Sequence, residues 1–167
     1  MNSSLELLYL IVFTGILAVG YSYLLSGQIL SSSAGNEKMR EIAGAIQIGA
    51  KAYLNRQYKT ISIVGLIVLI IVTYFFNILV GIGYFVGATL SGIAGYVGML
   101  ISVQANVRTA EASRKSLQDG LSIAFKSGAI TGLLVAGLAL LSIAIYYLIL
   151  INLNTPSREI INALVAL

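Results

Sequence analysis

The sequence predicts an all-α integral membrane protein, and its composition and hydropathy pattern support this fold class. The chain of 167 residues is 58% hydrophobic, with a mean hydropathy of +0.94. Only 10% of its residues are charged, compared with about 25% in an average soluble domain. The apolar runs are continuous and lack the alternation that marks transmembrane barrel strands. We therefore expect a multi-pass helical protein in contact with the lipid bilayer.

Charge-free stretches indicate how many helices cross the membrane. No Asp, Glu, Lys or Arg occurs in residues 7–36, 60–107 and 127–157. A spanning helix needs about 20 apolar residues, so the first and third stretches each hold one span and the second holds two. The four predicted spans lie near residues 5–26, 60–80, 82–105 and 128–151. The first is longer than the apolar run of a signal peptide and follows no basic residue, so we expect it to be retained.

The basic residues predict the orientation of the chain. Nine of the ten Lys and Arg residues fall in two connections, residues 27–59 and 106–127, and only Arg158 lies elsewhere. Loops kept on the cytoplasmic side carry such an excess of basic residues. We therefore expect both connections to be cytoplasmic and the N-terminus to be outside, with the cell membrane as the location. This pattern explains the net charge of +4 without a nucleic-acid partner.

The first connection has the pattern of an amphipathic helix over residues 36–59. Asn36 is a plausible N-cap, Glu37 would lie in the first turn, and apolar residues recur at three and four residue spacings. No proline separates this helix from the second span, so the two are expected to form one long helix. We interpret the segment as a supporting helix at the membrane surface; a ligand-contacting face is the alternative.

A charged cluster in the second connection comprises Arg108, Glu111, Arg114 and Lys115. Their helical spacing predicts that Glu111 pairs with Arg108 on one turn and with Arg114 or Lys115 on the next. We interpret these pairs as ordering the helix end. Binding of a phosphorylated ligand is the alternative, because basic clusters beside membranes also recognise phosphate groups.

Small residues recur every four positions in the last two predicted spans. Such rows allow helices to approach closely in lipid, so we expect them to be packing surfaces. The first span has only Gly15 and Gly20, and we expect it to be the more lipid-exposed. The rows are Gly83, Gly87, Ser91 and Gly95; Ala94, Gly98 and Ser102; and Gly128, Gly132 and Ala136.

The sequence offers no catalytic constellation. It contains no Cys and no His, no phosphate-binding glycine loop and, apart from Glu6 at the start of the first, no charged residue within a predicted span. Glu111 and Asp119 are eight residues apart among basic neighbours, and a paired acid and base is the less favoured interpretation. We therefore predict no catalytic, cofactor-binding or metal-binding residue in this chain.

The last residues are expected to begin a fifth span. Pro156 should break the helix, and Glu159 can begin a new one. Residues 159–167 are too few to cross a hydrocarbon core about 30 Å thick. We therefore expect a truncated start of a fifth span, and the N-terminal part of a longer protein. The alternatives are a stand-alone four-span scaffold or partner subunit, and the N-terminal half of an unrelated secondary transporter.

Four segments of the chain resemble the membrane-bound, pyrophosphate-energised ion pumps known as membrane pyrophosphatases. They are AIQIGAKAYLNRQYKTI at 45–61, GATLSGIAGYVGM at 87–99, ANVRTAEASR at 105–114 and LSIAFKSGAITGLLVAGLALL at 121–141. Their order and spacing also match. The chain is uncharged at four positions where the resemblance leads us to expect charged residues: Gln47, Ile48, Asn55 and Gln104.

The resemblance implies a homodimeric helical pump with roughly sixteen spans per subunit. Such a pump couples the hydrolysis of magnesium pyrophosphate to outward transport of protons or, in some members, of sodium, and some members require potassium. Its catalytic residues lie in later spans, so none can be assigned to a residue of this chain. Within this fragment the resemblance implies no bound cofactor, and the partners of the four spans are the remaining spans of the same pump.

Overall fold

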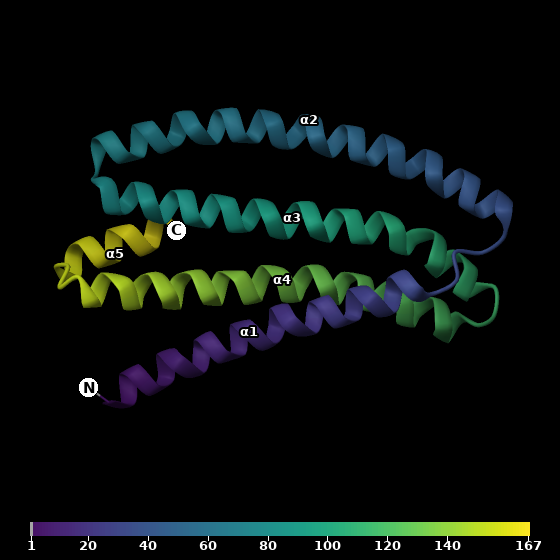
Figure 1. The fold of residues 1–167 in the computed structure, drawn as a ribbon, viewed down its shortest axis with the longest axis horizontal. Coiled ribbons are helices and arrows are strands. Elements are labelled where there is room, and N and C mark those ends of the chain that lie inside the picture. Colours follow the sequence, from purple (N-terminus) through teal and green to yellow (C-terminus); the bar gives the residue numbers. More distant parts are fainter. Residues whose placement is uncertain (1) are drawn as a thin grey trace.

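The computed structural model describes residues 2–167, and side chains from Leu5 onward. Over this range all regular elements are helical: α1 (Asn2–Ser31), α2 (Glu37–Phe75), α3 (Ile78–Ser113), α4 (Leu117–Asn152) and α5 (Ser157–Ala166). The first four are long and apolar enough to cross a membrane. They lie side by side in alternating directions, with their turns gathered at the two ends (Figure 1). The predicted all-α fold class with four spans is confirmed.

Helix α4 lies at the centre of the bundle. It packs against α1 on one side and α3 on the other, whereas α2 contacts only α3 among the described helices. The short α5 lies against α3 and α4 at the end opposite the α3–α4 turn (Figure 1). No residue in the most apolar part of α2 is buried, so α2 is the outermost helix.

Two apolar clusters hold the bundle together at its two ends. Near the α3–α4 turn, residues from α1, α3 and α4 meet: Leu25, Ile29, Ile101, Ala105 and Ile130. Near the opposite end, α4 and α5 contribute Tyr146, Leu150, Ile160 and Ala163. The hydroxyl of Tyr146 also donates a hydrogen bond to the backbone carbonyl of Leu79, which ties α4 to the start of α3.

Helix α2 confirms that the amphipathic segment and the second span are continuous. Asn36 is its N-cap, with the Asn36 side chain accepting a hydrogen bond from the amide of Met39, and Glu37 lies in the first turn. The helix has 39 residues and is therefore about 58 Å long. A hydrocarbon core is about 30 Å thick, so close to half of α2 extends beyond it.

The break between the second and third spans lies earlier than expected. The predicted spans 60–80 and 82–105 meet near Gly81, but α2 ends at Phe75 and α3 begins at Ile78. Asn77 caps α3 by accepting a hydrogen bond of 2.9 Å from the amide of Val80. Because the residues around this break are apolar, hydropathy gives no sign of it.

Most of the second connection, residues 106–127, belongs to the two helices that it joins. Helix α3 continues to Ser113, and α4 begins at Leu117 with Ser116 as its N-cap.

At the other end of α4, the helix stops at Asn152 and Pro156 precedes α5, with Glu159 in the first turn. The predicted helix break and new helix start are confirmed.

The glycine row of α3 is a packing surface, as expected, and it faces more than one neighbour. A Cβ atom at Gly83 would meet the carbonyl of Ala163 in α5, whereas one at Gly95 would lie 2.6 Å from the Tyr58 hydroxyl in α2. Residues four apart advance by about 40° around a helix, so a row of four positions turns by about 120°. The second row does pack on α4, since a Cβ at Gly98 would lie 2.8 Å from the Thr131 hydroxyl.

The predicted packing row of α4 is wrong. Added Cβ atoms at Gly128 and Gly132 would meet no neighbour within 4 Å. The close contact is made instead by Gly137, where an added Cβ would lie 3.0 Å from the carbonyl of Gly15 in α1. Gly15 is buried, so α1 has a close helix crossing, and the span most exposed to lipid is α2.

Candidate functional site

The two acidic residues considered as an acid–base pair have separate structural contacts. The carboxylate of Glu111 lies 3.0 Å from the guanidinium of Arg114. Asp119 lies in the first turn of α4, where a carboxylate interacts favourably with the positive end of the helix dipole. The backbone amide of Asp119 donates a hydrogen bond to the Ser116 hydroxyl. No group of three or more His, Cys, Asp or Glu side chains is placed to hold a metal ion within residues 2–167.

Side chains of α3 and α4 hold the C-terminal end of α1. The guanidinium of Arg108 donates to the carbonyl of Leu30 at 3.0 Å and to the carbonyl of Gln104 at 2.7 Å. The ammonium of Lys126 donates to the side-chain oxygen of Gln28 at 3.2 Å. Helix α1 has no basic residue in its own last turn, so these two cations complement the negative end of its dipole.

The charged cluster of the second connection is arranged differently from the prediction. Glu111 pairs with Arg114, as expected, but the expected pair with Arg108 is wrong because Arg108 binds backbone carbonyls. Gly35, in the turn between α1 and α2, has a φ of +80° and packs over this cluster, since a Cβ there would lie 3.1 Å from Glu111 Oε2. The contacts of Arg108 and Arg114 are with protein atoms, which supports the interpretation that the cluster orders the helix ends.

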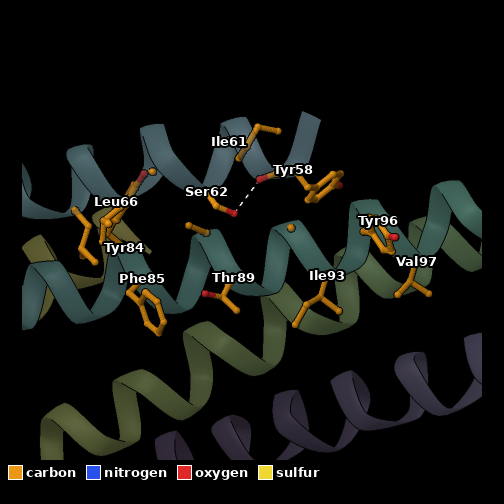
Figure 2. Close-up of a pocket in the computed structure, with 14 residues that line it drawn as sticks. Tyr58, Ile61, Ser62, Leu66, Tyr84, Phe85, Thr89, Ile93, Tyr96 and Val97 are labelled. Atoms are coloured by element: carbon orange, nitrogen blue, oxygen red, sulfur yellow. Dashed lines mark hydrogen bonds between the residues drawn. The ribbon is translucent and has the colours of Figure 1, made fainter. Parts of the chain in front are cut away.

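A groove of about 470 Å³ separates α2 from α3 (Figure 2). It is mostly apolar, and every residue that lines it belongs to one of these two helices. Its lining residues are Tyr58, Ile61, Ser62, Gly65, Leu66, Leu69, Tyr84, Phe85, Ala88, Thr89, Gly92, Ile93, Tyr96 and Val97. This volume is within the range of about 300–1,000 Å³ that is typical of ligand pockets.

Aromatic residues join the two helices at the end of the groove nearer the basic residues. The rings of Tyr58 and Tyr96 make an edge-to-face contact with centroids 5.2 Å apart. The Tyr96 hydroxyl donates a hydrogen bond of 2.8 Å to the side-chain oxygen of Asn55. Sequence analysis noted Asn55 only as an uncharged position, and it could not identify this contact because its partner is 41 residues away.

These features define the class of protein. The chain is a multi-pass helical membrane protein in which polar contacts join helix ends and a mostly apolar groove lies between α2 and α3. The family described as "Inorganic H+ pyrophosphatase" matches residues 16–167. The chain belongs to this family.

Individual relatives agree with this assignment. The chain is 40% identical over 146 residues to a K(+)-insensitive pyrophosphate-energized proton pump of Methanosarcina mazei, an alignment covering 86% of this chain and 22% of the relative. It is 41% identical over 150 residues to a putative K(+)-stimulated pyrophosphate-energized sodium pump of Bacteroides thetaiotaomicron, covering 86% and 20%. A K(+)-insensitive proton pump of Moorella thermoacetica is 36% identical over 155 residues, covering 92% and 23%. The chain thus spans about a fifth of the length of these relatives.

Proposed function

We propose that this chain forms the first four spans, and the start of the fifth, of a membrane pyrophosphatase that couples pyrophosphate hydrolysis to proton transport. The family match over residues 16–167 is the observation that carries this proposal. Relatives named as proton and sodium pumps match at 40% and 41% identity, so similarity does not separate the two ions. The family description favours the proton as the first ion to test.

In this proposal the chain is a structural part of the pump. Its six acidic residues are dispersed, and residues 2–167 do not place three metal-ligating side chains together. This donor set does not fit a magnesium site, because Mg²⁺ is held by carboxylates together with substrate phosphates. Pyrophosphate, magnesium and any potassium would therefore bind to residues outside this chain, and the proposed assembly is a homodimer of the longer protein.

The proposed orientation has the N-terminus outside the cell membrane. Nine of ten basic residues belong to the first part of α2, the end of α3, the α3–α4 turn and the start of α4. These segments lie at the same end of the bundle, and the N-terminus lies at the opposite end (Figure 1). The excess of basic residues on cytoplasmic segments supports this orientation.

Ion transport by inverted membrane vesicles tests the proposal. Vesicles that contain the longest product of the gene should acidify when pyrophosphate and Mg²⁺ are added, and a protonophore should abolish the signal. Vesicles with only residues 1–167 should neither hydrolyse pyrophosphate nor acidify. Sodium uptake that persists with the protonophore would show a sodium pump instead. A gene product that ends at Leu167 and hydrolyses no pyrophosphate would refute the proposal in favour of a stand-alone scaffold.

A further inference from the structure

Two tyrosines reach across the groove between α2 and α3, one from each helix. The ring of Tyr58 reaches across to α3 and would lie 3.7 Å from a Cβ at Gly92. The hydroxyl of Tyr84 reaches across to α2 and would lie 3.7 Å from a Cβ at Gly65. Figure 2 shows the two tyrosines at opposite ends of the hollow.

The length of the groove matches one leaflet of a bilayer. On α2 it extends over the twelve residues from Tyr58 to Leu69, which corresponds to about 16 Å along the helix. Half of a hydrocarbon core is about 15 Å thick. The apolar part of α2 begins at Thr60 and ends at Phe75, so the groove lies in the half of the membrane nearer the basic residues.

The walls of the groove favour an apolar occupant. Aliphatic and aromatic side chains form most of its surface, and no charged residue lines it. Ser62, one of its few polar residues, donates its hydroxyl to the carbonyl of Tyr58 at 2.8 Å. Because this hydroxyl donor is already used within the helix, it offers little attraction for a polar ligand.

Two cations of α2 lie about two helical turns before residues that line the groove. Lys51 is seven residues before Tyr58, and Lys59 is seven residues before Leu66, so each shares a helix face with a lining residue. From Ile42 to Phe75, α2 contains no acidic residue. The ion pairs found within the described part of the chain are Lys38–Glu41 and Glu111–Arg114, and neither uses Lys51 or Lys59. An anionic group would complement these two cations.

We propose that the groove between α2 and α3 is a binding site for an anionic glycerophospholipid. One acyl chain lies along the groove, and the phosphate group lies at the membrane surface near Lys51 and Lys59. The matching length, the apolar walls and the cations at one end support this occupant together. The site is independent of the proposed pump activity, because its ligand is a component of the membrane.

Native mass spectrometry of the detergent-purified protein tests this site with phosphatidylglycerol and phosphatidylcholine as probes. The protein is expressed from its own gene, so any further spans are present. Wild-type protein should retain one more phosphatidylglycerol than the variants Ser62→Phe and Ala88→Phe, which fill the groove from either wall. The matched control is Thr60→Phe, because Thr60 is exposed on α2 and does not line the groove. This control should retain the lipid.

Charge variants separate specific binding from general lipid contact. Lys51→Gln and Lys59→Gln should each reduce the preference for phosphatidylglycerol over phosphatidylcholine about fivefold. Lys115→Gln, an exposed cation near the α3–α4 turn, should not change the preference. Equal lipid retention by wild type and both groove-filling variants would overturn the site, and would indicate that another helix fills the groove. Equal binding of the two lipids by wild type would overturn the assigned headgroup.

Discussion

Arg108 shows how one side chain can join two helices that are distant in sequence. Its guanidinium binds the carbonyl of Leu30, which is 78 positions earlier, as well as the carbonyl of Gln104 on its own helix. A carbonyl at the end of α1 has no partner within its helix, so the contact satisfies a group that is otherwise left free. Hydrogen bonds to a charged donor are stronger than those between neutral groups.

Replacing Arg108 should therefore destabilise the bundle. We expect Arg108→Ala to lower the free energy of unfolding by about 1.5–3 kcal/mol, the usual loss for a hydrogen bond to a charged group. Unfolding in mixed micelles with increasing sodium dodecyl sulfate measures this change. The control is Lys115→Ala, because Lys115 is exposed and its side chain makes no hydrogen bond to the residues that the structure describes. A loss as large for Lys115→Ala would contradict the role assigned to Arg108.

Two glycines of α4 should respond oppositely to the same substitution. At Gly137 a new Cβ would lie 2.9 Å from Val19 Cγ2 and 3.0 Å from the Gly15 carbonyl, so Gly137→Ala should cost about 1–3 kcal/mol. At Gly132 no atom lies within 4 Å, so Gly132→Ala should be neutral or stabilise the helix by roughly 0.5–1 kcal/mol. The same micelle titration compares the variants. Equal destabilisation by both would show that α4 does not cross α1 at Gly137.

At the scale of elements, Asn77 determines where α3 begins. Its side chain accepts a hydrogen bond from the Val80 amide, and without this acceptor the amide would be unpaired in an apolar environment. We expect Asn77→Ala to cost about 0.5–2 kcal/mol, whereas Asn77→Ser should retain most of the stability because serine also caps helices. Thermal unfolding followed by circular dichroism measures both variants. Similar losses for alanine and serine would indicate that the cap is unimportant.

The sequence predicts which segments form helices more fully than it predicts which helices pack against each other. Hydropathy and charge indicated four spans, and the Asn36 cap and unbroken pattern indicated the continuous α2. Hydropathy could not locate the break at Asn77, because apolar residues flank it. Nor could spacing identify the partner of a small residue: Gly132 and Gly137 look alike in sequence, and only the crossing of α1 separates them. The groove walls and the Arg108–Leu30 contact likewise depend on which helices become neighbours.

At the scale of the whole molecule, the two ends of the bundle differ in charge and in the contacts that join the helices. The basic residues gather at the end where Arg108 and Lys126 hold α1, and the opposite end is joined by the contacts of Tyr146 and α5. Both ends therefore contain an apolar cluster, and the end with the basic residues adds the cationic contacts of Arg108 and Lys126. This division matches a bundle with a cationic surface on one side of the membrane and a less charged surface on the other.

Single cysteines in the turns can test this polarity directly, because this chain has no native cysteine. Ser33→Cys lies in the turn between α1 and α2, and Thr155→Cys lies in the turn between α4 and α5. A membrane-impermeant maleimide should label Ser33→Cys only in inverted vesicles and Thr155→Cys only in intact cells, in a background without other cysteines. Detergent-solubilised protein, in which both positions should react, controls for accessibility. Labelling of both positions from the same side would refute a bundle with four membrane crossings, whereas the reverse pattern would keep the four spans and place the N-terminus in the cytoplasm.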